Sequence, residues 1–163
     1  MPNNSLLVLK SNEWVGMDYA YTPSVLGGHV SYWAKLDGME SGCVAGVYLV
    51  RQSASCDLEA SNSDGTPQCP SIDLMQTSPG GFETSANPCP NGICDEISQC
   101  KMTLKTTNYG PESFGPGGSI IDTNLWFNVQ NDLVSTTDYS TMWKLRTTLW
   151  QNYNTIVMEA ECP

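Results

Sequence analysis

Residues 69–76 have the residue types and spacing of a strand that could carry carboxylate chemistry. They read Cys-Pro-Ser-Ile-Asp-Leu-Met-Gln, with Ser71, Asp73 and Gln76 as the polar side chains that follow Pro70. Side chains of a β-strand alternate between its two faces, so Ser71 and Asp73 point to the same side. Asp73 is the one carboxylate and stands between a hydroxyl and an amide. It could hydrogen-bond a polar ligand, and without further context the pattern is also that of a half-polar strand facing solvent.

Most of the chain predicts short β-strands that would position this stretch, because β-rich segments alternate with turn-forming Gly, Pro and Asp. Strands are expected at residues 5–9, 29–36, 46–50, 69–76, 102–104, 119–123 and 125–130, and little regular structure between 79 and 100. Only residues 140–158 show helical periodicity, with apolar side chains at three- and four-residue steps. The sequence therefore predicts a single domain over residues 1–163, an antiparallel sandwich with one short helical segment near the C-terminus.

The composition narrows the class of partner. Lys and Arg number 7 against 17 Asp and Glu, and the resulting net charge of −10 argues against a nucleic-acid backbone or an anionic membrane. No apolar run approaches the length of a membrane span. Residues 1–5 lack the charged and apolar regions of a secretory signal, so we expect either a mature secreted form or a protein that is not secreted.

Seven cysteines are spread among Pro, Gly and Ser residues: Cys43, Cys56, Cys69, Cys89, Cys94, Cys100 and Cys162. A metal site would need closely paired cysteines or nearby histidines, and His29 is the sole histidine. A disulfide framework in an oxidising, extracellular or lumenal compartment fits better, with no metal and no cofactor. The odd count leaves one thiol free or paired with another chain.

Several segments, taken in order, carry a resemblance to a known family. They are Leu-Gly-Gly-His-Val-Ser-Tyr-Trp (26–33) with Gly-Cys-Val-Ala-Gly-Val-Tyr-Leu-Val (42–50), then 69–76, Asn-Pro-Cys (87–89), 93–100, Ser-Phe-Gly-Pro-Gly with Ile-Asp-Thr (113–123), and Thr-Leu-Trp-Gln-Asn-Tyr (148–153). Six such matches in collinear order resemble glycoside hydrolase family 7, the cellobiohydrolases and endoglucanases that cleave β-1,4-glucan. The resemblance implies an all-β, concanavalin A-like jelly roll of two antiparallel sheets, with glucan along the concave face.

The departures from this family concern its catalytic residues. Carried over by position, Ser71 stands at the nucleophile, Asp73 at the supporting carboxylate, Gln76 at the acid/base and Asn87 at a nearby histidine. Retaining hydrolysis requires two carboxyl groups about 5–5.5 Å apart. Serine without a base cannot form the glycosyl intermediate, and a glutamine amide has no proton to transfer at neutral pH. The resemblance therefore implies a family member without its hydrolytic activity, shortened relative to the family.

The resemblance also suggests disulfides Cys56–Cys69, Cys94–Cys100 and Cys43–Cys162, with Cys89 as the odd cysteine. Aromatic faces can stack on sugar rings, and Trp150 resembles a sugar-platform tryptophan of the family. Tyr48, Asp73 and Trp150 are accordingly the candidate glucan contacts. Other aromatic residues are more often core components: Tyr32, Trp33, Trp126 and Trp143.

Three functional hypotheses follow from different classes. The first is a non-catalytic structural or assembly subunit whose partners are other protein subunits, joined through the odd cysteine. The second is a lectin-like module that binds β-glucan through Tyr48, Asp73 and Trp150. The third is a residual hydrolase that recruits Glu83 or Asp57 as a replacement carboxylate.

Overall fold

The computed structural model describes residues 27–40, 42–50, 71–87, 100–103, 109–135 and 142–162, which are almost entirely β-structure. A short 3₁₀ turn, η4 (Pro111–Ser113), precedes the small strands at one end. The strands are β1 (His29–Ala34), β2 (Ala45–Val50), β3 (Ser71–Ser78), β4 (Gly81–Asn87), β5 (Cys100–Thr103), β6 (Phe114–Gly115), β7 (Ile121–Asp122), β8 (Phe127–Ser135), β9 (Met142–Gln151) and β10 (Asn154–Glu161).

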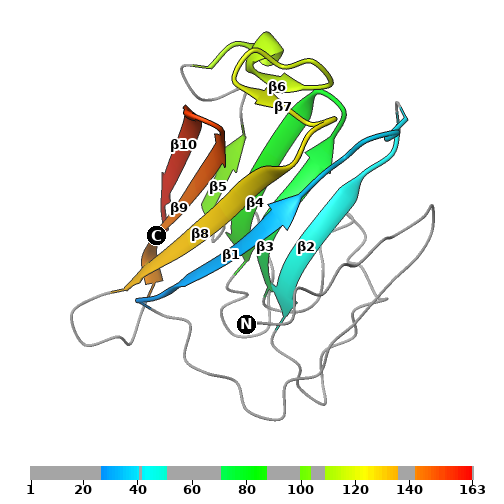
Figure 1. Cartoon of the computed structure of the whole chain (residues 1–163). Helices are drawn as coiled ribbons and strands as arrows, with labels where there is room; N and C mark the ends of the chain where they lie inside the picture. The colour runs from blue at the N-terminus through cyan, green and yellow to red at the C-terminus, as the bar shows by residue number, and fades with distance from the viewer. Residues whose placement is uncertain are drawn as a thin grey trace, which may run out of the picture.

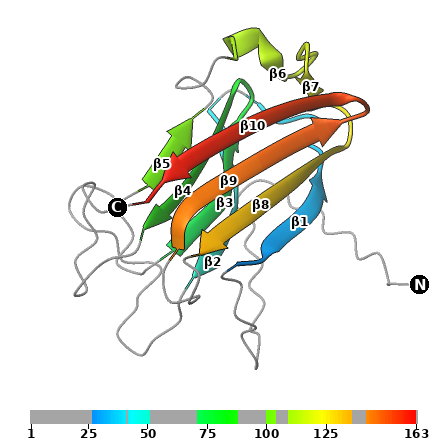
Figure 2. The same ribbon diagram turned by 90° about the vertical axis from the view of Figure 1, so that its left-hand side faces the viewer.

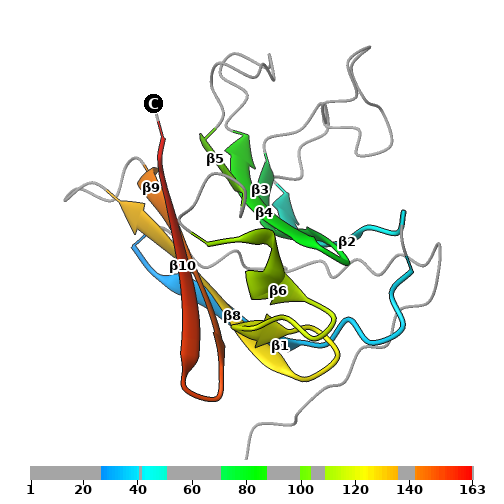
Figure 3. The same ribbon diagram turned by 90° about the horizontal axis from the view of Figure 1, so that it is seen from above.

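Two four-stranded antiparallel sheets make up the fold. Sheet A has the strand order β1-β8-β9-β10, and sheet B has the order β2-β3-β4-β5. The sheets form two layers (Figure 1), and β10 runs alongside β5 at one side of the sandwich (Figure 2). The parallel pair β6-β7 lies across one end, as Figure 3 shows from above. This architecture confirms the predicted all-β sandwich of two antiparallel sheets.

The core lies between the two sheets and follows from alternation along each strand. On β8, Phe127, Val129 and Leu133 are fully buried and alternate with more polar side chains on the outer face. Phe114 of β6 packs edge to face against both Phe82 and Phe127, with ring centroids 5.5 and 5.8 Å apart. Such pairs contribute about 0.5–1.5 kcal/mol beyond their buried area. The end segment thereby ties sheet B to sheet A.

The predicted helical segment over residues 140–158 is wrong, because these residues form the hairpin β9-β10. Leu145 and Leu149 are both fully buried, and a four-residue step keeps side chains on one face of a strand as well as of a helix. The step therefore does not distinguish the two structures. The turn after Gln151 distinguishes a hairpin from a helix, because Asn152 has a φ of 55°, a conformation that asparagine tolerates in tight turns.

The region between residues 79 and 100 contains more regular structure than predicted. Phe82, Thr84 and Ala86 are buried on alternate positions of β4, with polar residues between them. Five predicted strands are confirmed with shifted ends as β1, β2, β3, β5 and β8, while residues 119–123 shorten to β7. The strand predicted at residues 5–9 lies outside the described residues.

The predicted disulfide Cys43–Cys162 is wrong. Cys43 carries a free, exposed thiol, whereas Cys162 is disulfide-bonded. Cys43 precedes β2, one edge of sheet B, and Cys162 follows β10, which lies alongside β5 at the opposite edge. The two cysteines are therefore held at different sides of the sandwich. The structure does not describe the side chains of the other predicted pairs, Cys56–Cys69 and Cys94–Cys100. The same holds for Cys89, the predicted odd cysteine.

Candidate functional site

A β-bulge in β3 gathers the polar side chains of residues 71–76 on one face. In the pairing of β3 with β4, Asp73 lies opposite Ser85 and Gln76 lies opposite Glu83. Between these pairs, two residues of β3 face a single residue of β4. Both bulge residues, Leu74 and Met75, are buried in the core. Asp73 and Gln76 thus share the outer face of sheet B, although an odd three-residue step would place them on opposite faces of a regular strand.

Hydrogen bonds fix Asp73 on this face. The Ser85 hydroxyl donates to Asp73 Oδ2 at 2.7 Å, and the Ser71 hydroxyl lies 3.5 Å from Oδ1. The Thr84 hydroxyl, on the core side, donates to the main-chain carbonyl of Asp73 at 2.8 Å. Both Ser71 and Ser85 are buried. The carboxylate is therefore pre-oriented by its neighbours, which lowers the entropy cost of binding a ligand there.

Tyr48 of β2 brings an aromatic ring to the same face. It lies opposite Asp73 in the β2-β3 pairing and is 40% exposed. Its ring leans over Gly46, where any side chain would collide with it, and Gly46 pairs with Gln76. Partial burial, together with the charges of Asp73 and Glu83, raises the pKa of the Tyr48 hydroxyl above its ordinary value. The hydroxyl is therefore a neutral hydrogen-bond donor at physiological pH.

The outer face of sheet B brings together most of the predicted site. Ser71, Asp73 and Gln76 come from β3, and Tyr48 and Glu83 come from the strands on either side. The backbone of Asn87 pairs with Ser71, while its side chain lies outside the described ones. Asp57 lies outside the described residues. We call the group Tyr48, Asp73, Gln76 and Glu83 the sheet B face.

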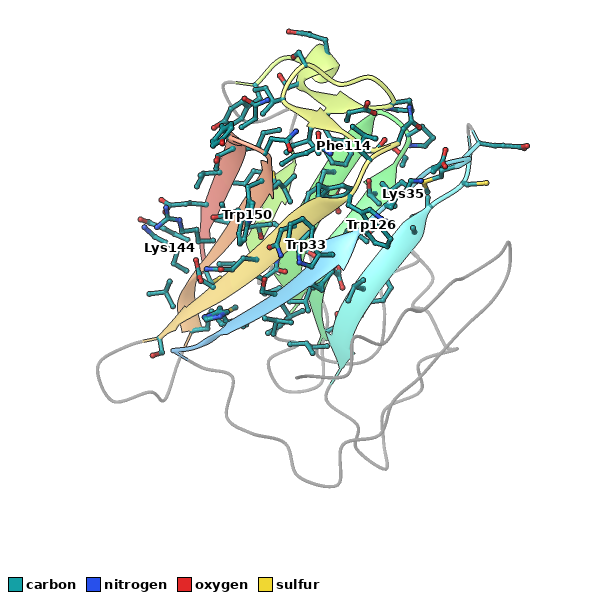
Figure 4. All side chains as sticks on the ribbon, in the orientation of Figure 1. Trp33, Lys35, Phe114, Trp126, Lys144 and Trp150 are labelled. Carbon is teal, nitrogen blue, oxygen red and sulfur yellow. The ribbon has the colours of Figure 1, made fainter. Side chains whose placement is uncertain are left out.

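Trp150 does not join this group. Its neighbours in β9 are both buried, Leu149 in the core and Gln151 against the backbone of Asp122 and Trp126, so Trp150 points to the outer face of sheet A. In Figure 4 it is seen on the side of the molecule formed by β1, β8 and β9. The predicted glucan contacts are thus divided: Tyr48 and Asp73 lie on one side of the sandwich and Trp150 on the other.

Sequence reasoning missed two features of the site. The bulge brings Gln76 to the face of Asp73, and its signal is the apolar pair Leu74-Met75 in a strand that otherwise alternates. The strand β4 places Glu83 directly opposite Gln76, and its signal is the alternation from Phe82 to Ala86. Within the described residues, no cluster of His, Cys, Asp and Glu could hold a metal ion, and no helix could cross a membrane.

Comparison with known proteins shows a likeness of fold. No protein-family model matches the chain, and no curated protein matches it in sequence. Among solved structures, an endoglucanase I complexed with cellobiose matches with a TM-score of 0.60 and 16% identity, over 82% of this chain and 44% of that one. A Humicola insolens endocellulase matches with a TM-score of 0.61 and 14% identity, over 82% of this chain and 43% of that one. A GH7 family cellobiohydrolase from Daphnia pulex matches with a TM-score of 0.59 and 14% identity, over 82% of this chain and 45% of that one. The fold is cellulase-like.

The match covers less than half the length of each of the three enzymes, while most of this chain takes part in it. The structural match establishes a shared fold, while sequence identities of this size leave activity open. The chemistry available to this chain therefore has to be argued from its own residues.

Proposed function

We propose that this chain binds β-1,4-glucan on the sheet B face without hydrolysing it. The observation that carries the proposal is the bulge at Leu74-Met75, which keeps Asp73 and Gln76 on one outer face beside Tyr48. An aromatic ring flanked by carboxylate and amide groups suits a sugar, whose ring has apolar faces and a rim of hydroxyls. The cellobiose complex among the structures of similar fold is consistent with a ligand of this class.

The residues on either side of the bulge support the non-hydrolytic part of the proposal. Gln76 offers an amide, which cannot donate a catalytic proton at neutral pH. The Ser71 hydroxyl lies beside Asp73 at 3.5 Å, too long for the strong hydrogen bond of an activated nucleophile. Asp73 itself is held by Ser85 at 2.7 Å. This arrangement supports recognition of a ligand, because neither Ser71 nor Gln76 supplies the carboxyl group that a retaining mechanism needs at its position.

Calorimetric titration with cellohexaose tests the binding. We expect heat of binding from the wild-type protein and an affinity about tenfold lower or worse for Tyr48→Ala, as for the loss of an aromatic anchor. Asp73→Ala should also weaken binding, since it removes the charged acceptor. Tyr153→Ala is the matched control because Tyr153 is fully exposed at the β9-β10 turn, away from this face. Wild-type protein that gives no heat at millimolar sugar contradicts the proposal.

Incubation with a soluble cellulose derivative tests the lack of hydrolysis. We expect no new reducing ends from the wild-type protein. If reducing ends appear, the non-hydrolytic part of the proposal fails, and Glu83, opposite Gln76, becomes the replacement acid. In that case Glu83→Gln should abolish the activity. Restoration of cleavage by Ser71→Glu with Gln76→Glu would instead support the loss of catalytic residues as the cause of inactivity.

An assembly subunit is the second candidate, and the position of Cys43 favours it. The thiol is free and exposed, next to the exposed side chain of Val44, at the start of the edge strand β2. A disulfide from Cys43 to another chain would join subunits without disturbing either sheet. Non-reducing electrophoresis of protein from its native source should then show a covalent oligomer that Cys43→Ser abolishes. If the wild-type protein runs as a monomer, like Cys43→Ser, this role is contradicted.

The proposed location is an extracellular or secretory compartment. Its support is the disulfide of Cys162, because such bonds persist in oxidising environments. Fractionation of the native source, with detection of the protein in the secreted fraction, tests it.

A further inference from the structure

The outer face of sheet A carries its side chains in ordered rows. The register of β1, β8, β9 and β10 defines three of them, each running across all four strands. The first row is Trp33, Asn128, Trp150 and Thr155; the second is Ser31, Gln130, Thr148 and Val157; the third is His29, Asp132, Arg146 and Glu159. The first two rows contain no ionisable side chain. We call them together the sheet A platform.

Two tryptophans flank a buried amide in the first row. Trp33 is 60% exposed, and Trp150 is partly exposed. Asn128 lies between them and is only 4% exposed, although it belongs to the outer face. Its Oδ1 accepts a hydrogen bond from the Ser31 hydroxyl at 3.1 Å, which links the first row to the second. The amide is thus a fixed polar group between two aromatic rings.

A third tryptophan extends the aromatic surface. Trp126 precedes the buried Phe127, is half exposed and is held through its carbonyl, which accepts a hydrogen bond from Gln151 Nε2 at 3.1 Å. Figure 4 labels Trp150, Trp33 and Trp126 across the same side of the molecule. Two exposed tryptophans and a partly exposed one on one side of a monomer are unusual, because large apolar side chains are normally exposed singly.

The charges of this face are kept to its margins. Arg146 and Lys144 both pair with Glu159, at 3.4 and 3.5 Å, beyond the second row. On the other side of the first row, Lys35 pairs with Asp37 at 3.0 Å. The platform is therefore neutral in a chain with a net charge of −10. An anionic polymer would be repelled by the whole molecule, and a strongly cationic one would find no carboxylate on the platform.

We propose that the sheet A platform is a second binding surface, for a neutral polysaccharide whose sugar rings present flat apolar faces. Trp33 and Trp150 lie two strands apart, about 9–10 Å at the usual strand spacing, which is close to the length of a disaccharide unit. Two rings can stack on the tryptophans while the Gln130 amide and the two hydroxyls of the second row meet the hydroxyl rim. The surface lies on the opposite side of the sandwich from the sheet B face and does not depend on it.

The test uses regenerated amorphous cellulose as the polymer and a background in which the sheet B face is disabled. Tyr48→Ala with Asp73→Ala provides that background. We expect its adsorption to persist and to fall by about tenfold or more when Trp33→Ala is added, as for the removal of an aromatic anchor. Trp33→Phe should retain most of the adsorption, and Tyr153→Ala should not change it. Because Trp33 is 60% exposed, its replacement should leave the melting temperature unchanged.

Protection of Trp33 from oxidation, read by peptide mass spectrometry, gives an independent readout. Cellulose should protect Trp33 in the background variant. Loss of all adsorption in that background, with Trp33 unprotected, overturns the sheet A platform and leaves the sheet B proposal intact. The reverse result is adsorption that depends on Trp33 while cellohexaose shows no binding that depends on Tyr48. It would support the sheet A platform and contradict the sheet B proposal. Self-association that Trp33→Ala abolishes, with adsorption unchanged, would assign the face to a second copy of the chain and also overturn the proposal.

Discussion

The side-chain amide of Asn131 donates a hydrogen bond of 2.8 Å to the main-chain carbonyl of Leu74, across the interface between the two sheets. Asn131 is fully buried on β8, and Leu74 is one of the two bulge residues of β3. The same amide nitrogen donates to the Thr147 hydroxyl at 2.8 Å, and that hydroxyl donates to Thr84 at 3.3 Å. A buried polar chain from sheet A thus holds the bulge that orients the sheet B face.

Asn131→Ala should destabilise the fold and loosen the bulge together. The carbonyl of Leu74 would lose its partner in the core, at a cost of about 1–3 kcal/mol. Because the bulge sets the side of Gln76, cellohexaose binding should weaken as well. Urea unfolding and calorimetry measure the two effects. For the stability measurement Gln130→Ala is the control, since Gln130 is an amide on the same strand whose side chain bonds Asp132 on the outer face. Equal losses of unfolding free energy in both variants contradict the bridge between Asn131 and Leu74.

Gly46→Ala should weaken glucan binding with little effect on stability. A Cβ at Gly46 would occupy the space of the Tyr48 ring, and because that ring is partly exposed we expect it to turn outward. The ring would leave its place beside Gln76, while the core is untouched. We expect a change in unfolding free energy within about 0.5 kcal/mol, as for other surface substitutions. Gly80→Ala is the matched control, because a Cβ there meets open space. Unchanged cellohexaose affinity in Gly46→Ala would show that the ring position is immaterial.

Gln76→Glu should make the protein less stable at pH 7 than at pH 4, relative to wild type. The new carboxylate would lie directly opposite Glu83, and a like-charge cross-strand pair costs about 0.2–1 kcal/mol. Repulsion raises the pKa of the carboxyl groups in the folded state above their unfolded values, so the penalty is present above those pKa values and is relieved by protonation below them. Gln76→Met, neutral and of similar length, should show no such pH dependence in urea unfolding.

The sequence predicts the strands better than the turns and bulges between them. Alternation in residues 29–36 and 125–130 identifies β1 and the start of β8, because burial on one face leaves a period of two. The four-residue step from Leu145 to Leu149 fits a helix and a strand equally, so the sequence alone predicts a helix where the structure has a hairpin. Asp73 as a site residue follows from strand spacing. Gln76 and Glu83 as its neighbours depend on an extra residue in β3 and on pairing with β4, which only the folded sheet determines.

Tyr32 links burial to the stability of the protein in alkali. Its ring packs against the core on the inner side of β1, and its hydroxyl has no hydrogen-bond partner among the described residues. Burial raises the pKa of this hydroxyl far above its ordinary value of 10. In the unfolded chain the hydroxyl would ionise near pH 10. Its contribution to stability is therefore complete below that pH and declines as the pH rises toward the folded pKa.

Tyr32→Phe should remove the part of the stability loss at alkaline pH that comes from ionisation of Tyr32. At pH 7 the variant should be as stable as wild type or more so, by up to about 1 kcal/mol, because an unpaired buried hydroxyl is removed. Between pH 9 and 11 its free energy of unfolding should fall less steeply than that of wild type, since one fewer proton is released on unfolding. Urea unfolding across this range measures both. Tyr153→Phe is the control because Tyr153 is fully exposed, and its curve should follow that of wild type. A Tyr32→Phe curve parallel to wild type would mean that Tyr32 ionises as readily in the folded protein as in the unfolded chain.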